Sequence, residues 1–185
     1  ACFGIPFLTA YRAIFYDGAV TGQTLLIQGG AGTVSHYAIQ IAKQGGARVI
    51  ATVSGFEKGR IAKAAGADEI LNYRDKNYVD QLLKLTENRG ADRIIEVNLS
   101  ANVNLYDRIL APKGTAIIYG TADPLAKVPG MNFIVRGAHL KWFIVYEITD
   151  TELIEGTRYL AEILADGSLD TLIGARFSLE NIAAA

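Results

Sequence analysis

Short apolar runs alternate along the chain with longer segments in which apolar residues recur at helical spacing. In TVSHYAIQIAKQ, for example, Val34, Tyr37, Ala38 and Ile41 fall on one face of a helix. The apolar runs predict strands at 24–28, 47–54, 69–73, 93–98, 114–120 and 139–146. The helical segments are 33–44, 57–66, 77–89, 103–111 and 151–166, and a loop is expected over 121–137.

Strands that alternate with helices of about 10 to 15 residues indicate βαβ units and a parallel sheet. The strands are almost continuously apolar, which is typical of a sheet covered on both faces. We therefore predict an α/β fold, a single domain built on a Rossmann-type doubly wound parallel sheet. Ligands of such sheets bind at the carboxyl ends of the strands, so the loops that follow the strands form the candidate site.

Composition narrows the class of protein. The chain has 185 residues, half of them hydrophobic, which is enough for one domain with a sizeable core. The formal net charge of −1 gives no broad basic surface, so nucleic acid and anionic membranes are not expected as partners. The single cysteine, Cys2, excludes an internal disulfide and a cysteine zinc cluster within this chain. No apolar run reaches the roughly 20 residues that a membrane span needs, and we expect a cytoplasmic protein.

A glycine cluster joins the first predicted strand to the first predicted helix, in LLIQGGAGTVSHYAIQ. A Rossmann loop uses one glycine for the tight turn, a second for backbone approach to the pyrophosphate and a third for close packing. Gly30 and Gly32 suit the first two places, and Ser35 takes the third. The pyrophosphate would bind the N–H groups of Thr33 and Val34 at the helix N-terminus. The alternative is a glycine-rich turn without a ligand.

The end of the second predicted strand indicates which dinucleotide binds. An NAD site usually carries Asp or Glu about 20 residues after the glycine loop, to bind the ribose 2′-hydroxyl. Ser54 and Gly55 stand there instead, and Glu57 lies beyond the strand. A 2′-phosphate needs space, hydrogen-bond donors and positive charge, and Lys58 can supply the charge. We therefore predict NADP(H), although Lys58 can also be solvated helix surface, the interpretation we prefer for Arg60.

Four stretches resemble a known family: IPFLTAYRAI (5–14), LLIQGGAGTVSHYAIQIAK (25–43), VIATVSGFEKGRIAKAAGADEILNYRD (49–75) and ANVNL (101–105). The chain resembles the nucleotide-binding domain of medium-chain dehydrogenases/reductases, and among them the zeta-crystallin-like NADPH:quinone oxidoreductases. Glycine loops of that family usually read A-x-G-G-V-G. Here Thr33 and Ser35 replace two of the glycines.

The resemblance implies which residues hold the adenosine half of the cofactor. Ser54, Lys58 and Tyr73 match positions that hold the 2′-phosphate and the adenosine end. Asn98, or as an alternative Asn102, falls in the segment that borders the adenosine and its ribose.

The resemblance also assigns the nicotinamide half. It implies that Thr9 lies near the nicotinamide and that Gly120 and Thr121 end the fifth strand beside it. Phe143 and Ile144 fall in the strand that passes the carboxamide, with sheet core as the alternative. Only Phe143 is kept as a candidate.

By the same resemblance, the expected activity is hydride transfer from NADPH to a quinone-like acceptor, with the chemistry carried by the cofactor. No catalytic residue and no metal site is assigned, because His36 and His139 have no triad or metal spacing and are expected to be structural or surface residues. Two alternatives stay open. One is an enone or enoyl reductase on the same scaffold, and the other is a non-catalytic NADPH-binding protein, crystallin-like or RNA-binding.

The abrupt ends of the chain suggest a piece of a longer protein. We expect residues 1–20 to form a connecting helix from a missing substrate domain, and residues 21–185 to form the NADP(H)-binding Rossmann domain. Such a piece is expected to be inactive alone, because half of the catalytic cleft would be absent. The resemblance also implies a homodimer, formed through the apolar edge strand at 139–146.

Overall fold

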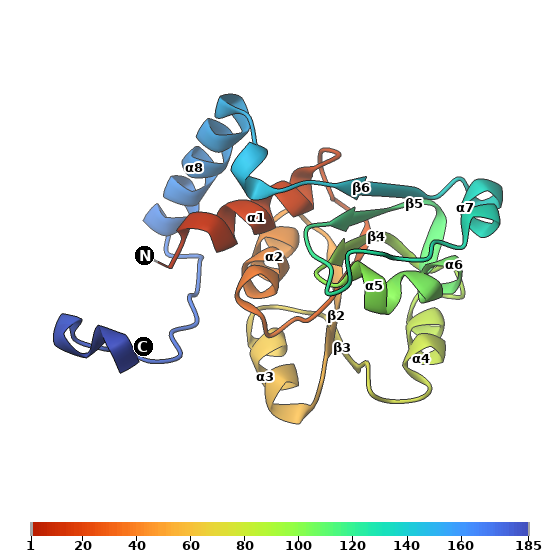
Figure 1. Cartoon of the computed structure of the whole chain (residues 1–185), viewed down its shortest axis with the longest axis horizontal. Helices are drawn as coiled ribbons and strands as arrows, with labels where there is room; N and C mark the ends of the chain where they lie inside the picture. The colour runs from red at the N-terminus through yellow and green to blue at the C-terminus, as the bar shows by residue number, and fades with distance from the viewer. Residues whose placement is uncertain (1, 185) are drawn as a thin grey trace.

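The computed structural model describes residues 2–184 and contains one sheet of parallel strands (Figure 1). The strand order is β3-β2-β1-β4-β5-β6, the doubly wound Rossmann order, so the predicted fold class is confirmed. The strands are β1 (Thr24–Ile27), β2 (Arg48–Val53), β3 (Glu69–Asn72), β4 (Ala91–Glu96), β5 (Leu110–Ile118) and β6 (His139–Trp142).

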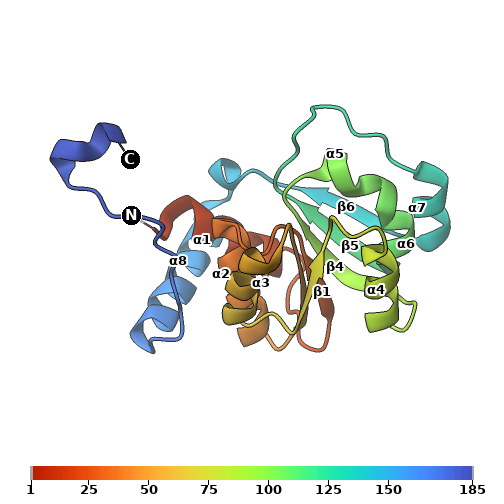
Figure 2. The same ribbon diagram turned by 90° about the horizontal axis from the view of Figure 1, so that it is seen from below.

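Helices cover both faces of the sheet (Figures 1 and 2). The helices on one face are α1 (Gly4–Phe15), α2 (Thr33–Gln44), α3 (Phe56–Ala64) and α8 (Asp150–Ala165). The helices on the other face are α4 (Tyr78–Leu85), α5 (Leu99–Asn102), α6 (Tyr106–Ile109) and α7 (Gly130–Arg136). Each face buries its own apolar cluster, which explains why the strands carry apolar residues at nearly every position.

Helix α1 belongs to the folded core. Phe7, Ala10 and Ile14 are fully buried in the same cluster as Tyr37 of α2 and Ile163 of α8. The apolar side chains of α1 recur at helical spacing because one stripe of the helix faces α2. The expectation that residues 1–20 connect to a preceding substrate domain stays a prediction.

Helix α4 is shorter than the predicted 77–89. It ends at Leu85, where the Thr86 hydroxyl donates a hydrogen bond to the Leu82 carbonyl at 2.9 Å. Glu87 and Asn88 then adopt left-handed backbone angles, with φ of 52° and 63°. A left-handed residue cannot continue a right-handed helix, so the predicted last turn is wrong.

The predicted helix at 103–111 is replaced by short helical turns, α5, a 3₁₀ turn at Val103–Leu105 and α6. These turns end at Ile109, because Leu110 already pairs with Ala91 of β4. The pairing then shifts register, in a stretch where Lys113 has a φ of 62°. This irregular start lengthens β5 at its amino end, and the strand stops at Ile118 instead of the predicted residue 120.

The predicted loop at 121–137 contains α7. This helix forms because Phe133 packs against the core on the face that holds Tyr106. Pro129 precedes its first residue, and Gly137 ends it with a φ of 61°. Tertiary packing therefore outweighs the local proline and glycine signals that predicted a loop.

The predicted strand at 139–146 is only four residues long, because its neighbour β5 ends at Ile118. The Phe143 N–H donates to the Ile118 carbonyl at 3.2 Å, and the chain then leaves the sheet for a 3₁₀ turn at Val145–Glu147. β6 does form an edge of the sheet, as predicted. The connecting helix expected over 1–20 is shorter, with α1 covering Gly4–Phe15, and the other predicted strands and helices begin and end within two residues of the observed ones.

In the described part of the chain, no helix combines the length and the apolar character needed to span a membrane.

Candidate functional site

The turn from β1 into α2 is made by two adjacent glycines with different tasks. Gly29 has a left-handed φ of +67°, which a residue with a side chain rarely adopts. Gly30 has no room for a side chain, since an added Cβ would lie 2.8 Å from the Ala51 Cβ and 3.1 Å from the Ala62 Cβ. The tight turn therefore depends on Gly29, whereas the sequence had suggested Gly30 for this role. Gly30 instead allows close packing of the turn. The doubled glycine directly after the strand was the available signal.

Helix α2 begins at this turn and points its N-terminus at the carboxyl edge of the sheet. Its N-cap is Gly32, whose own added Cβ would lie 3.3 Å from the Gly29 carbonyl oxygen. No side chain caps this end in the described chain, so the first N–H groups, including those of Thr33 and Val34, have no helical partner. The buried Ser35 hydroxyl donates to the Gln28 carbonyl at 2.8 Å. This N-terminus can bind an anion through backbone N–H groups and the helix dipole.

A small cavity of about 220 Å³ lies beside the glycine turn. It is lined by Gly29, Ala31, Gly32, Val53, Ser54, Lys58 and Tyr73. The structure thus brings together Ser54, Lys58 and Tyr73, which the sequence analysis grouped at the adenosine end. Arg60 instead pairs with Glu57 at 3.2 Å on the exposed side of α3, in line with its interpretation as surface.

A larger cavity of about 430 Å³ adjoins the turn on the α4 and α5 side of the sheet. It is lined by Gln28, Gly29, Thr52, Tyr73, Tyr78, Val97, Asn98, Ala101, Asn102 and Leu105. Tyr73 lines both cavities, so they are neighbours. Asn98 and its alternative Asn102 both border this space.

A fully buried carboxylate, Glu96, holds the wall of the larger cavity. It accepts hydrogen bonds from the Tyr106 hydroxyl at 2.5 Å, the Asn102 amide at 3.0 Å and the Asn98 N–H at 2.6 Å. Burial raises the pKa of Glu96, and these hydrogen bonds oppose the rise. Glu96 was not among the predicted site residues, although an acid inside the apolar run RIIEVN was a visible signal.

The loops after β4 and β5 are clasped together. The Asn98 side-chain oxygen accepts from the Ser100 hydroxyl at 3.1 Å and from the Ala122 N–H at 3.0 Å. The Thr121 hydroxyl donates to the Asp123 carbonyl at 2.7 Å. Gly120 lies against the other loop, and an added Cβ would come within 2.4 Å of the Val97 carbonyl oxygen. Asn98, Gly120 and Thr121 are thus brought together, and the side-chain oxygens of Asn98 and Thr121 bind the protein itself.

Thr9 and Phe143 line neither of the two cavities. The Thr9 hydroxyl donates to the Ile5 carbonyl at 2.7 Å inside α1, and the side chain is buried. Phe143 is half-buried, with its ring 6.0 Å from the Tyr16 ring. It borders a separate hollow of about 360 Å³ between α1, β6 and α8.

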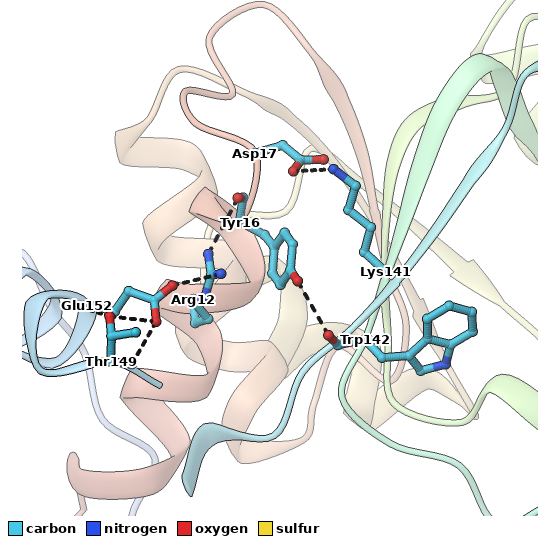
Figure 3. A network of polar contacts seen from close by, with 7 residues as sticks. All are labelled: Arg12, Tyr16, Asp17, Lys141, Trp142, Thr149 and Glu152. Atoms are coloured by element: carbon cyan, nitrogen blue, oxygen red, sulfur yellow. Dashed lines mark hydrogen bonds and ion pairs between the residues drawn. The ribbon is translucent and has the colours of Figure 1, made fainter. Parts of the chain in front are cut away.

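Polar contacts tie β6 and α8 to α1 around that hollow (Figure 3). Arg12 pairs with Glu152 at 2.8 Å, and Lys141 pairs with Asp17 at 2.6 Å. The Tyr16 hydroxyl donates to the Trp142 carbonyl at 3.4 Å. The position of Phe143 therefore depends on the packing of α1.

The histidines have no metal or catalytic partners in the described part of the chain. His36 is buried and its nearest acid is Asp170, at 3.6 Å, while His139 is exposed at the start of β6. Burial lowers the pKa of His36, and Asp170 opposes this. Within residues 2–184, no group of three or more His, Cys, Asp or Glu side chains is arranged to hold a metal ion.

Comparison with known proteins decides the family. Residues 33–161 match the model of a family described as zinc-binding dehydrogenase. The chain belongs to this family. The predicted resemblance to quinone oxidoreductases is confirmed as well: the quinone oxidoreductase of Sus scrofa is 34% identical over 188 residues, covering all of this chain and 56% of that protein. The chain thus spans about half the length of that curated relative.

Solved structures show the same fold. A mycobacterial quinone oxidoreductase superposes with a TM-score of 0.85 at 25% identity, over 97% of this chain and 59% of that one. The CurK enoyl reductase superposes with a TM-score of 0.85 at 23% identity, over 100% of this chain and 56% of that one. The family description names zinc, but the described residues of this chain offer no ligand set that fits a zinc ion.

Gly120→Ala should destabilise the protein by roughly 1–3 kcal/mol, because the new methyl group must push apart two clasped backbones. Gly130→Ala is the matched control, since an added Cβ there meets nothing within 4 Å and neither glycine is left-handed. Urea unfolding followed by circular dichroism measures both. Equal unfolding midpoints for the two variants would show that the loops separate at no cost.

Proposed function

We propose that the chain is the NADP(H)-binding domain of an NADPH-dependent quinone oxidoreductase, which transfers hydride from NADPH to a quinone-like acceptor. The observation that carries the cofactor assignment is the cavity beside the glycine turn. It is lined by Ser54 and Lys58, and no acid stands at the end of β2 where an NAD site would carry one. A ribose 2′-phosphate fits that donor set, and a carboxylate there would repel it.

The loops at this edge of the sheet suggest where the other parts of the dinucleotide would bind. The pyrophosphate would bind the backbone N–H groups at the start of α2, close to Gly32. The uncharged adenosine would enter the larger cavity, because the buried carboxylate of Glu96 behind its wall disfavours a phosphate there. The nicotinamide would extend toward Gly120 and Thr121.

When bound, NADPH supplies the hydride. The chain's own residues bind and orient the cofactor, and we propose no catalytic acid or base among them. Phe143 and Thr9 would lie beside the nicotinamide, held by the contacts between α1 and β6. The sequence relatives support a quinone-like acceptor, and a substrate domain of the longer protein would form the other wall of the cleft.

A second candidate is an enone or enoyl thioester reductase. The full-length match of this chain to part of the CurK enoyl reductase supports it at the level of the fold. The two candidates share the cofactor site and differ in the acceptor.

The cofactor proposal predicts that NADPH binds more tightly than NADH, by about tenfold to a hundredfold, since a charge-assisted phosphate contact contributes about 1.5–3 kcal/mol. Lys58→Ala should lose most of this preference. Arg60→Ala is the matched control, because Arg60 pairs with Glu57 and does not line the phosphate cavity. Fluorescence titration measures both affinities. Equal NADPH and NADH affinities in the parent protein would contradict the proposal.

The activity proposal predicts that this 185-residue chain binds NADPH but oxidises it with naphthoquinone near the uncatalysed rate. Orientation of the acceptor and exclusion of water need both walls of the cleft. The absorbance of NADPH gives the rate, with the full-length protein as the positive control. Comparable turnover by the short chain would mean that the active site has been placed wrongly.

We further propose a homodimer that pairs β6 of one copy with β6 of another. β6 is an edge strand, and beside it α7 exposes Met131, Ile134 and Val135 at 70%, 75% and 79%. Because β6 has only four residues, this apolar helix face would add the area that the short strand lacks.

Light scattering should therefore show a dimer at micromolar concentration. Ile134→Glu should yield a monomer, because the dimer would have to bury an unpaired charge in its interface. Ile154→Glu is the control, because Ile154 is an exposed isoleucine on α8, at 56% exposure. A monomeric parent protein would rule out this interface.

A further inference from the structure

The side-chain amide of Gln28 is buried at the carboxyl end of β1, where Gln28 is 3% exposed. Its Oε1 atom accepts a hydrogen bond from the Thr52 hydroxyl at 2.5 Å. Its Nε2 atom is closed off from solvent and has no partner in the described chain. A buried amide nitrogen without an acceptor is costly, and native structures rarely leave one without a reason.

A relay of hydrogen bonds sets the orientation of this amide. The Gly29 N–H donates to the Thr52 hydroxyl oxygen at 3.2 Å, and that hydroxyl donates its single proton to Gln28 Oε1. Because the oxygen faces Thr52, the nitrogen and its two protons face elsewhere. The backbone of the glycine turn thus directs the donor end of the amide.

Gln28 and Thr52 both line the larger cavity. They share the side of the sheet that faces α4 and α5, with Leu26 and Ile50 below them in the same core cluster. The carboxylate of Glu96 lies behind the cavity wall, where it accepts a hydrogen bond from the lining residue Asn102 at 3.0 Å. Such a space favours an uncharged group that carries hydrogen-bond acceptors.

We propose that Gln28 is a cofactor-binding residue. When adenosine occupies the larger cavity, a small shift of the side chain that keeps the Thr52 hydrogen bond brings Nε2, which is closed off from solvent in this structure, to an uncharged acceptor atom, a ribose oxygen or a ring nitrogen. This inference rests on the proposed function, which places the adenosine in this cavity. The two cavities then divide the recognition: Lys58 distinguishes the phosphate of NADPH, whereas Gln28 binds the nucleoside common to NADPH and NADH.

Gln28→Met tests this division, because methionine has a similar length and no donor. We expect the variant to bind NADPH, NADH and adenosine 2′,5′-bisphosphate each about five- to tenfold more weakly by calorimetry, with the ratio of NADPH to NADH affinity unchanged. Lys58→Ala should change that ratio instead. The matched control is Gln23→Met, at the other end of the same strand, where the amide binds the Ala19 carbonyl at 3.2 Å.

A second measurement uses only the parent protein and so does not depend on whether a variant folds. In the parent protein, the side-chain NH₂ signals of Gln28 in a ¹⁵N-correlated spectrum should shift on addition of adenosine 2′,5′-bisphosphate, and those of Gln23 should not. Unmoved Gln28 signals, or unchanged affinities in Gln28→Met, would overturn this inference and leave the proposed function standing. A parent protein that binds neither NADPH nor NADH would overturn both.

Discussion

The chain has to turn from β1 into α2 within contact distance of β2 and α3. At position 30 of this turn only glycine fits, because a side chain would collide with these two elements. The residues that face Gly30, Ala51 of β2 and Ala62 of α3, are themselves small, so the turn packs as close to β2 and α3 as the backbones allow. That closeness places the Gly29 N–H against the Thr52 hydroxyl. One steric restriction therefore sets the direction of α2, the shape of both cavities and the orientation of the neighbouring amide.

Opposite charges lie on the two sides of Tyr73. Lys58 lines the smaller cavity, whereas the buried Glu96 lies behind the wall of the larger one. Such an arrangement separates a phosphate from an uncharged nucleoside, because Lys58 attracts the phosphate and Glu96 repels it. It would therefore fix which end of the adenosine enters which cavity, and with it the direction in which the dinucleotide crosses the glycine turn.

Sequence patterns predicted the sheet and most of its helices, which depend on local periodicity, and placed Ser54 and Lys58 at a strand end. The family resemblance added Tyr73 to this group. The helix around Phe133 was missed because only packing against the core reveals it. β6 was predicted too long because its length is set by the end of β5, which no local pattern records. Gln28 was missed for a related reason: it stands at the end of an apolar run, and its role depends on a hydroxyl from another strand.

The loops after β4 and β5 are built differently from the glycine turn. Around the glycine turn, backbone N–H groups and the Gln28 amide nitrogen lack partners within the described chain. By contrast, the side-chain oxygen of Asn98 already accepts two hydrogen bonds, and the Thr121 hydroxyl donates its proton to the Asp123 carbonyl. Groups that are already paired gain little by binding a ligand, because an existing hydrogen bond must first be broken. Asn98 and Thr121 would therefore act on a cofactor through the loop positions that they fix, while the glycine turn supplies most of the free donors.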